Sequence, residues 1–389
     1  MAGRTVAALL GLAAAAVLVV AVLAGRTTVD VAVPSPSASP EASPTAPPRA
    51  SPSPSPAASP SPSPTAGVLS DRYGYVLPDH GRLIVRAETA DRPVGSVDGW
   101  TGAAVSPDGR RIAVWQPSRT GDGPERLVVV DVATRAEREL LTAAAVMRGG
   151  SIAWANDGTG LFYSVHSRES VVGAGPRVSE LHSYDLAAAR APGATEPELR
   201  RSDGFAFVPV GWDKAAQVAF AVVTGEGGFA AEYLVWDKRS LPAGQPAVRR
   251  AGVPWPVLFS TVFASPDGKT VLAVDLAANA LRLWPASNIA QAATVQRGPA
   301  RIYDARWRPD SRDIVWVLGP EVRLTTYQTD AERVVYRGEE QMTIAAVRPD
   351  GSAALVRRGG RVVVVELAGG RTADLPYAEH LLPHGVALR

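Results

Sequence analysis

Residues with obvious potential for chemistry are few in this chain, and they are scattered. The 389 residues include no cysteine and five histidines. Thiolate ligands, disulfides and a cysteine nucleophile are therefore excluded. The nearest approach to a metal motif is the pair His380 and His384 in HLLPH. Such a pair binds zinc on one face of a helix, but Pro383 breaks the helix and the glutamate of a metalloprotease is missing. We expect no metal site there.

The other three histidines, His80, His166 and His182, stand alone in turns or beside an irregular loop. We interpret them as surface or packing residues. The sequence also contains no G-x-S-x-G elbow, phosphate-binding loop or calcium-binding loop. It therefore indicates no catalytic residue, no cofactor and no metal, and we expect a protein that is not an enzyme.

Four aspartates recur in similar surroundings, in the tetrapeptides SPDG, SPDG, RPDS and RPDG. Proline presets φ at the first central position of a type I turn, and aspartate stabilises the second. Glycine then takes a left-handed conformation that bulky residues avoid. We therefore interpret the aspartates as turn residues and not as a carboxylate cluster. They are Asp108, Asp267, Asp310 and Asp350.

These turns join apolar runs that must pair as antiparallel strands. A sheet of about four strands cannot bury both of its faces alone, but sheets stacked around an axis cover one another. The turns recur between 40 and 57 residues apart, which is the length of four short strands with their loops. The clear copies are AAVSPDGRRIAVW at 103–115, VFASPDGKTVLAV at 262–274, ARWRPDSRDIVWV at 305–317 and AAVRPDGSAALV at 345–356, with weaker copies at 152–165 and 207–223.

This turn with its flanking strands resembles the repeat of the TolB-like β-propeller family, a relative of WD repeats. The resemblance covers 69–389 and implies an all-β propeller of four-stranded blades. Six repeats are visible, and a partial unit at 73–88 precedes them. The last residues, 384–389, would supply the strand that this unit lacks. We therefore expect seven blades, alternatively six, with both ends of the chain joined in one blade.

The residues before the repeats have a different composition. Val6–Gly25 contains no charged or strongly polar residue, and as a helix it would span about 30 Å, the thickness of the hydrocarbon core of a bilayer. We expect an N-terminal transmembrane anchor or signal peptide over 1–26, and we favour the anchor because a cleaved signal peptide has a shorter apolar core. A disordered Pro/Ser-rich linker would follow over 27–68, because it has little apolar surface to bury.

Both alternatives for the first segment place the TolB-like propeller, 69–389, outside the cytoplasm. With the anchor, the protein would be a single-pass protein of the cell membrane, with its propeller on the extracytoplasmic side. With a cleaved signal peptide, it would be secreted.

Eight of the nine tryptophans fall into two groups by their place in the repeat. Trp100 and Trp255 lie at boundaries between repeats, and we expect them on a rim of the propeller, where they would bind a partner. Strand tryptophans carry much apolar area, so we expect them to pack between blades. These are Trp115, Trp154, Trp236, Trp284, Trp307 and Trp316.

The net charge is +2, from 40 Lys and Arg against 38 Asp and Glu. Charge therefore gives no reason to expect a nucleic-acid partner. The resemblance implies protein–protein interaction at the cell envelope. We expect a non-enzymatic scaffold, displayed outside the membrane, for interaction with proteins or recognition of a ligand. Its partner would be an envelope or extracellular protein, or a peptide or glycan.

The alternative is a lactonase- or lyase-like propeller enzyme with a metal at the central channel. Carboxylates or histidines that converge at the channel mouth would favour it.

Overall fold

The computed structural model describes residues 67–79, 82–117, 123–171, 175–188, 197–238, 247–297, 301–329, 331–377 and 385–388. The expected anchor over Val6–Gly25, most of the expected Pro/Ser linker, His80, His380 and His384 lie outside these residues. In the described part of the chain, no helix is long and apolar enough to cross a bilayer. Regular structure there consists of strands and three short 3₁₀ segments.

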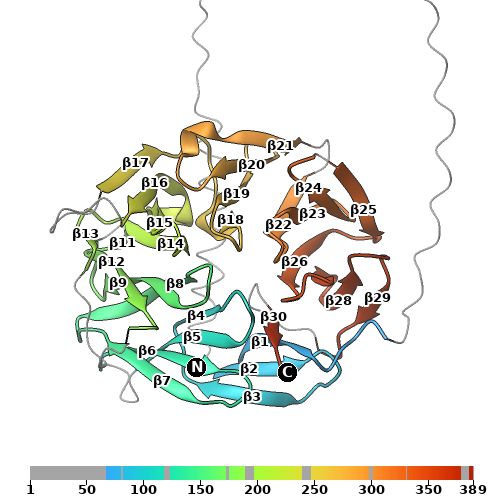
Figure 1. Cartoon of the computed structure of the whole chain (residues 1–389), viewed down its shortest axis with the longest axis horizontal. Helices are drawn as coiled ribbons and strands as arrows, with labels where there is room; N and C mark the ends of the chain where they lie inside the picture. Colours follow the sequence, from blue (N-terminus) through green and yellow to red (C-terminus); the bar gives the residue numbers. More distant parts are fainter. Residues whose placement is uncertain are drawn as a thin grey trace, which may run out of the picture. The chain divides into compact units, whose positions relative to one another are not determined.

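Seven four-stranded antiparallel sheets, the blades, surround a common axis (Figure 1). We number the blades along the chain. From the axis outward, blade 2 has β4 (Gly102–Val105), β5 (Arg111–Gln116), β6 (Arg126–Asp131) and β7 (Glu137–Thr142). Blade 3 has β8 (Met147–Trp154), β9 (Gly160–Ser167), β12 (Ser179–Asp185) and β13 (Leu199–Arg201). Between β9 and β12 in the chain, β10 (Ser170–Val171) and β11 (Gly175–Pro176) form a small separate hairpin.

The next four blades repeat the same order. Blade 4 has β14 (Ala206–Asp213), β15 (Val218–Thr224), β16 (Ala230–Asp237) and β17 (Ala247–Gly252). Blade 5 has β18 (Val262–Ala264), β19 (Thr270–Asp275), β20 (Ala280–Pro285) and β21 (Ala293–Arg297). Blade 6 has β22 (Ile302–Trp307), β23 (Asp313–Leu318), β24 (Glu321–Thr326) and β25 (Ala331–Arg337). Blade 7 has β26 (Met342–Val347), β27 (Ala353–Arg358), β28 (Arg361–Glu366) and β29 (Thr372–Asp374).

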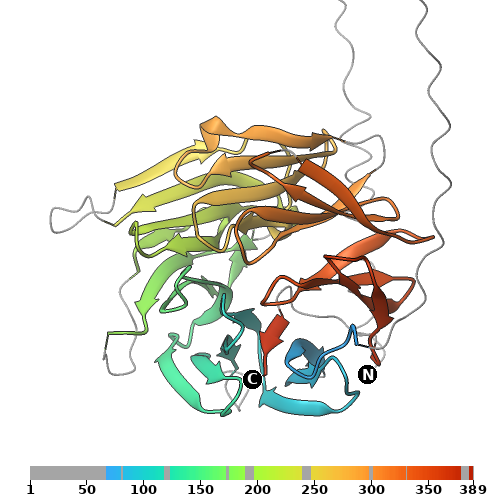
Figure 2. The ribbon, with the colours of Figure 1, turned by 45° about the vertical axis from the view of Figure 1, so that its right-hand side comes forward.

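Blade 1 combines the two ends of the described chain, and this confirms the prediction of seven blades over six. Its sheet order is β3-β2-β1-β30, with β1 (Tyr73–Asp79), β2 (Arg82–Ala87), β3 (Pro93–Asp98) and β30 (Gly385–Ala387). The C-terminal strand β30 pairs antiparallel with β1 in the register Gly74↔Val386. Figure 2 shows β30, in red, beside the blue strands of blade 1.

The partial repeat at 73–88 differs from the others in which strands its turn connects. The turn after β1 joins the second and third strands of blade 1, whereas each SPDG-type turn joins the first and second strands of its blade. The first strand of blade 1 comes from the other end of the chain. This explains why the turn of the partial repeat stands so close in sequence to the next one.

The turn aspartates have the structural role that the sequence predicts. The Oδ1 atom of Asp108 accepts hydrogen bonds from the Ser106 hydroxyl at 2.6 Å and from the Arg110 amide at 3.1 Å. Asp267 repeats the pattern with Ser265 and Lys269. Gly109 adopts φ +71°, the left-handed conformation that the turn requires.

The SPDG-type turns also bond from blade to blade, and we call this set the turn ring. Between blades 5 and 6, the Asp267 amide donates to Ser311 Oγ at 2.9 Å. Between blades 6 and 7, Arg308 Nε donates to the Gly351 carbonyl at 3.1 Å. The Tyr73 hydroxyl donates to Asp350 at 2.7 Å, and the Ala387 amide donates to the Gly109 carbonyl at 2.9 Å. The last two contacts tie blade 1 to its neighbours on both sides.

Tryptophan side chains fill the space between blades, as the sequence predicts. The six strand tryptophans are between 0 and 7% exposed. Trp154 Nε1 donates to the Ala104 carbonyl of the preceding blade at 3.0 Å, and Trp307 Nε1 donates to the Phe263 carbonyl at 3.2 Å. Trp154 and Trp307 therefore both cover a neighbouring sheet and bond to it.

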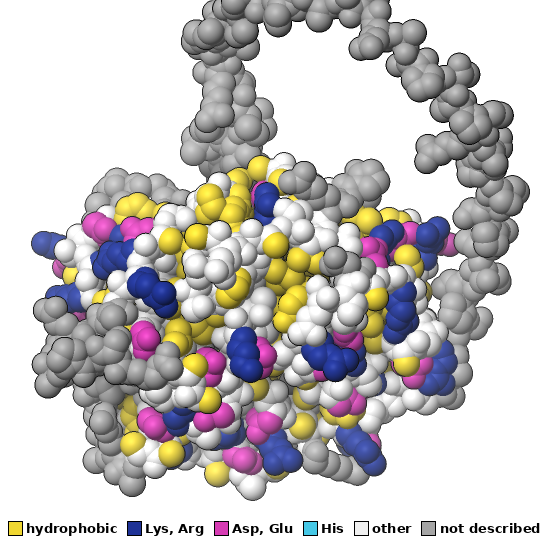
Figure 3. All heavy atoms as spheres, turned by 45° about the horizontal axis from the view of Figure 1, so that its top comes forward, with side chains coloured by type: hydrophobic (Ala, Val, Ile, Leu, Met, Phe, Trp, Pro, Cys, Tyr) yellow, Lys and Arg dark blue, Asp and Glu magenta, His cyan; other side chains and the backbone are white. Residues whose placement is uncertain are grey.

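Charged side chains of both signs are interspersed on the surface in view in Figure 3, mainly towards its periphery, and hydrophobic side chains gather nearer its middle. This distribution agrees with the small net charge of +2.

A buried ion pair joins blade 7 to blade 1. The guanidinium of Arg348 bonds to the carboxylate of Glu88, and these side chains are 7% and 0% exposed. Tyr75 donates its hydroxyl proton to Glu88 Oε1 at 2.6 Å, and Arg348 Nη2 donates to the Val68 carbonyl at 2.6 Å. Because each charge has several partners, the cost of burying it is offset.

Ring closure through β30 gives a prediction about stability. Val386 is fully buried in blade 1, so Val386→Asp places an unpaired carboxylate in the core and is expected to lower the free energy of unfolding by more than about 3 kcal/mol. Urea unfolding followed by tryptophan fluorescence measures this. Val334→Asp, at a 42% exposed site on β25, is the control, with an expected change of about 0.5 kcal/mol or less. Equal effects of the two variants would show that β30 does not hold the ring together.

Candidate functional site

The central channel has two chambers, one at each end. The innermost strands contribute their N-terminal parts to one chamber and their C-terminal ends to the other. We call the first the wide chamber, because its volume is about 820 Å³. The second, the turn chamber, lies among the SPDG-type turns and has a volume of about 290 Å³. Small-molecule sites range from roughly 300 to 1,000 Å³, so the wide chamber is the better candidate.

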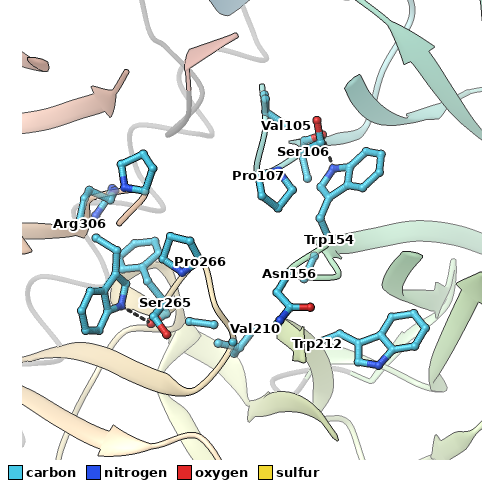
Figure 4. A pocket seen from close by; sticks show the side chains of 18 of the residues that line it. Val105, Ser106, Pro107, Trp154, Asn156, Val210, Trp212, Ser265, Pro266 and Arg306 are labelled. Atoms are coloured by element: carbon cyan, nitrogen blue, oxygen red, sulfur yellow. Dashed lines mark hydrogen bonds between the residues drawn. The ribbon is translucent and has the colours of Figure 1, made fainter. Parts of the chain in front are cut away.

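The turn chamber has a structural character. Figure 4 shows Pro107, Pro266 and Asn156 around its opening. The Asn156 side chain donates to the Asp267 carbonyl at 2.9 Å and accepts from the Lys214 amide at 3.1 Å. The side-chain amide of Asn156 is therefore engaged in holding blades 3, 4 and 5 together.

The wide chamber gathers polar and aromatic side chains from five blades. Blade 2 contributes the segment that leads into β4, and blade 3 contributes β8 and the end of β9. Blades 5, 6 and 7 contribute the 3₁₀ segment Phe259–Thr261, β22 and the β26–β27 hairpin. The side chains best suited to bind a ligand or take part in chemistry are Trp100, His166, Phe259, Asp304, Arg306 and Arg357.

Strand β22 places an ion pair in the channel wall. Ala305 and Trp307 are buried in the blade, whereas Asp304 and Arg306 alternate with them and line the chamber. A β-bulge between Ile302 and Asp304 shifts the register here, and bulges commonly redirect side chains beside functional sites.

The pair is fixed on several sides. Arg306 Nη1 bonds to Asp304 and donates to the Ala305 carbonyl at 2.9 Å, and its guanidinium lies 4.1 Å from the centroid of the Phe263 ring. Both charged side chains are 13% exposed. Burial raises the pKa of Asp304 and lowers that of Arg306, while each charge partly offsets the effect on the other.

His166 is held as a neutral imidazole in the opposite part of the wall. Its Nδ1 lies 3.0 Å from Ser179 Oγ, and its Nε2 lies 3.4 Å from Ser164 Oγ. Burial, aided by the positive charge of Arg148, lowers the pKa of His166 to about 4. Gly150 makes room for the ring, because a Cβ atom there would lie 2.4 Å from the imidazole Nε2.

The two rim tryptophans of the sequence analysis are not brought together. Trp100 lines the wide chamber. Trp255 lies in the connection from β17 to β18, where its ring meets Trp284 edge-on at 5.9 Å and Arg282 lies 5.2 Å from its centroid. His182 is a packing residue, as expected, because it is 6% exposed and stacks on Tyr163 at 5.2 Å.

Sequence reasoning missed the charged lining of the wide chamber and interpreted His166 as a surface or packing residue. One signal was available for Arg306. The three other clear repeats have Ala104, Phe263 and Ala346 at the position that Arg306 occupies relative to the turn. An arginine at a position that is apolar in the other repeats needs a partner and a polar surface to face.

Among the described residues, no group of three or more His, Cys, Asp or Glu side chains is placed to hold a metal ion. His166 and Asp304 both line the wide chamber, but they are not part of such a group.

No family model matches the chain, and no curated protein matches it in sequence. Solved structures do match. The structure of apo AztD from Citrobacter koseri is 11% identical, with a TM-score of 0.52 over 81% of this chain and 97% of that one. The Pseudomonas aeruginosa periplasmic gluconolactonase PpgL is 14% identical, with a TM-score of 0.51 over 82% of this chain and 99% of that one.

TolB from Acinetobacter baumannii is also among the matches. It is 14% identical, with a TM-score of 0.43 over 82% of this chain and 67% of that one. At identities this low, the matches to AztD and PpgL show a shared fold and do not assign a function.

The environment of His166 predicts a pH effect on stability. The pKa of an ordinary histidine is about 6.5, so below that pH the unfolded chain takes up a proton that the folded chain binds only near pH 4. The contribution of His166 to stability is therefore full above pH 6.5 and is lost as the pH falls towards 4. Between pH 6.5 and 4 the free energy of unfolding of the wild type should fall by up to about 3 kcal/mol more than that of His166→Gln. Urea unfolding at several pH values measures this. A constant difference between the two proteins would contradict it.

Proposed function

We propose that this protein is a non-enzymatic recognition scaffold, held outside the cytoplasmic membrane, whose propeller binds an envelope or extracellular protein. The observation that carries the proposal is the location of its exposed apolar side chains. The antiparallel topology places every connection between blades, and every connection between second and third strands, at the same end as the wide chamber. We call this end the wide face.

Of the five large hydrophobic side chains exposed in the described residues, four lie in connections on the wide face. They are Val146, Phe229, Phe259 and Leu276, with exposed fractions between 37 and 71%. The fifth, Val334, lies on an outer strand. Exposed apolar groups that gather on one face commonly mark sites of interaction.

Three of these residues are held near one another by backbone contacts with the β17–β18 connection, which also carries Trp255. Phe229 forms a β-bridge with Leu258, beside Phe259 in the chain, and the Leu276 amide donates to the Pro256 carbonyl at 3.4 Å. We call Phe229, Trp255, Phe259 and Leu276 the apolar rim patch. Aromatic side chains near the centre of an interface commonly supply much of its binding energy. The patch therefore suits a protein surface with its own apolar centre.

Two further features agree with this function. The apolar run Val6–Gly25 and the Pro/Ser tract after it, both outside the described residues, suit an anchor and a spacer. A tethered scaffold gains effective concentration for partners at the same membrane. Its rigid blades also present loops in fixed positions, as a binding surface requires.

The patch gives a prediction about partner capture. Phe229→Asp combined with Leu276→Asp puts two charges into the patch without touching the lining of the wide chamber, and should reduce capture of the partner at least ten-fold. The full chain, cross-linked in membranes and purified with its neighbours, is analysed by quantitative mass spectrometry.

Val334→Asp, an exposed valine elsewhere on the propeller, is the matched control and should capture the partner as the wild type does. A protein that cross-links equally to the wild type, the double variant and Val334→Asp would not be bound by the patch. The absence of any enriched envelope or extracellular protein would oppose the whole proposal.

A propeller enzyme with a metal at the channel is the second candidate, because His166 and Asp304 both line the wide chamber. Metal-dependent turnover of a lactone or a polysaccharide by the wild type, lost in His166→Gln, would favour it over the scaffold.

A further inference from the structure

The wide chamber carries more positive than negative charge. Its lining includes the guanidinium groups of Arg306 and Arg357 and the single carboxylate of Asp304. Arg306 also borders the turn chamber (Figure 4). His166 adds no charge at neutral pH, because its pKa is about 4. The side chains of the lining therefore have a net charge of about +1. The buried carboxylate of Glu125 lies directly behind them, where it accepts hydrogen bonds from the Thr101 hydroxyl at 3.0 Å and from the Gly149 amide at 2.7 Å.

Arg306 has binding capacity that the protein does not use. Its Nη1 bonds to Asp304 and to the Ala305 carbonyl. Its Nε is buried without a partner, and within the described residues its Nη2 makes no hydrogen bond. A guanidinium has five N–H donors in a rigid plane. Because Nε is inaccessible, Nη2 is the donor that remains for a ligand. The guanidinium is held against the Phe263 ring, 4.1 Å from its centroid, and a group fixed in this way is preorganised for an oxyanion.

The rest of the lining suits an organic molecule. Hydroxyl groups of Ser260 and Thr343 provide neutral hydrogen-bonding partners, and the aromatic rings of Trp100 and Phe259 provide apolar faces. A volume of about 820 Å³ is ample for a small molecule. Arginines that approach an anion from two blades also fix its orientation, since Arg306 comes from β22 and Arg357 from β27.

We propose that the wide chamber is a binding site for a small organic monocarboxylate, with its carboxylate on Nη2 of Arg306 and close to Arg357. A single negative charge matches the net charge of the lining, whereas a phosphate ester, which carries nearly two charges at neutral pH, would leave an excess inside the channel. This site shares Phe259 with the apolar rim patch, but the proposal does not rest on a protein partner.

Titration calorimetry of the full chain in detergent, at low salt, tests the proposal with paired probes. Benzoate is compared with benzyl alcohol, and D-gluconate with sorbitol, so that each pair differs in the carboxylate. Glucose 6-phosphate tests the phosphate alternative. We expect at least one carboxylate to bind at least ten-fold more tightly than its neutral partner and more tightly than the phosphate. Equal binding within both pairs, or preference for the phosphate, would overturn the proposal.

Variants locate the site. Arg306→Gln alone leaves the carboxylate of Asp304 unpaired, so the main variant is Asp304→Asn with Arg306→Gln, which keeps the wall neutral. This double variant should bind the preferred carboxylate at least ten-fold more weakly, and Arg357→Gln, which keeps the ion pair, several-fold more weakly. Arg371→Gln, at an exposed arginine paired with Glu366, is the matched control and should bind as the wild type does. Circular dichroism confirms the fold of each variant. Wild-type affinity in both channel variants would place the carboxylate elsewhere and overturn the proposal.

Discussion

The pairing of β30 with β1 closes the ring, and the remaining packing depends on that closure. A four-stranded blade has two apolar faces and can cover neither by itself. The core clusters accordingly join residues of adjacent blades, such as Trp115 of blade 2 with Tyr163 of blade 3, whose rings meet edge-on at 5.7 Å. An open ring would leave two of these faces in water. The short strand β30, bonded to β1 and to the turn ring, prevents this.

Closure is reinforced by polar contacts at the same junction. Glu88 and Arg348 connect blades 1 and 7, and the same arginine bonds to the carbonyl of Val68, where the described chain begins. The N-terminal side of the propeller is thus held by the ion pair that also seals the ring.

The two ends of the channel differ because they are built from different parts of the repeat. The turn end is made of SPDG-type turns whose polar atoms bond to one another across blades, so little capacity remains for a ligand. The wide end is made of strand starts and longer connections, which carry no repeated sequence. Its side chains, including Arg306 and Phe259, are free to vary without loss of the turn ring. Binding at this end therefore leaves the elements that hold the fold together undisturbed.

The sequence by itself determined the architecture. The SPDG-type turns repeat at blade spacing, their proline, aspartate and glycine have local conformational reasons, and the apolar runs between them can only be buried strands. The seventh blade followed from an incomplete first repeat and a spare strand at the C-terminus. All of these features are local, or depend on a regular pattern that survives in one dimension.

Only the tertiary structure decided which side chains meet at the axis. His166, the pair Asp304 and Arg306, and Arg357 come from three strands that are far apart in the chain, β9, β22 and β27. The bulge in β22 shifts the register beside the pair that lines the channel. Trp100 and Trp255 occupy similar places in the repeat, yet only Trp100 lines the chamber. Strand order around a ring sets these distances, and neither composition nor spacing encodes them.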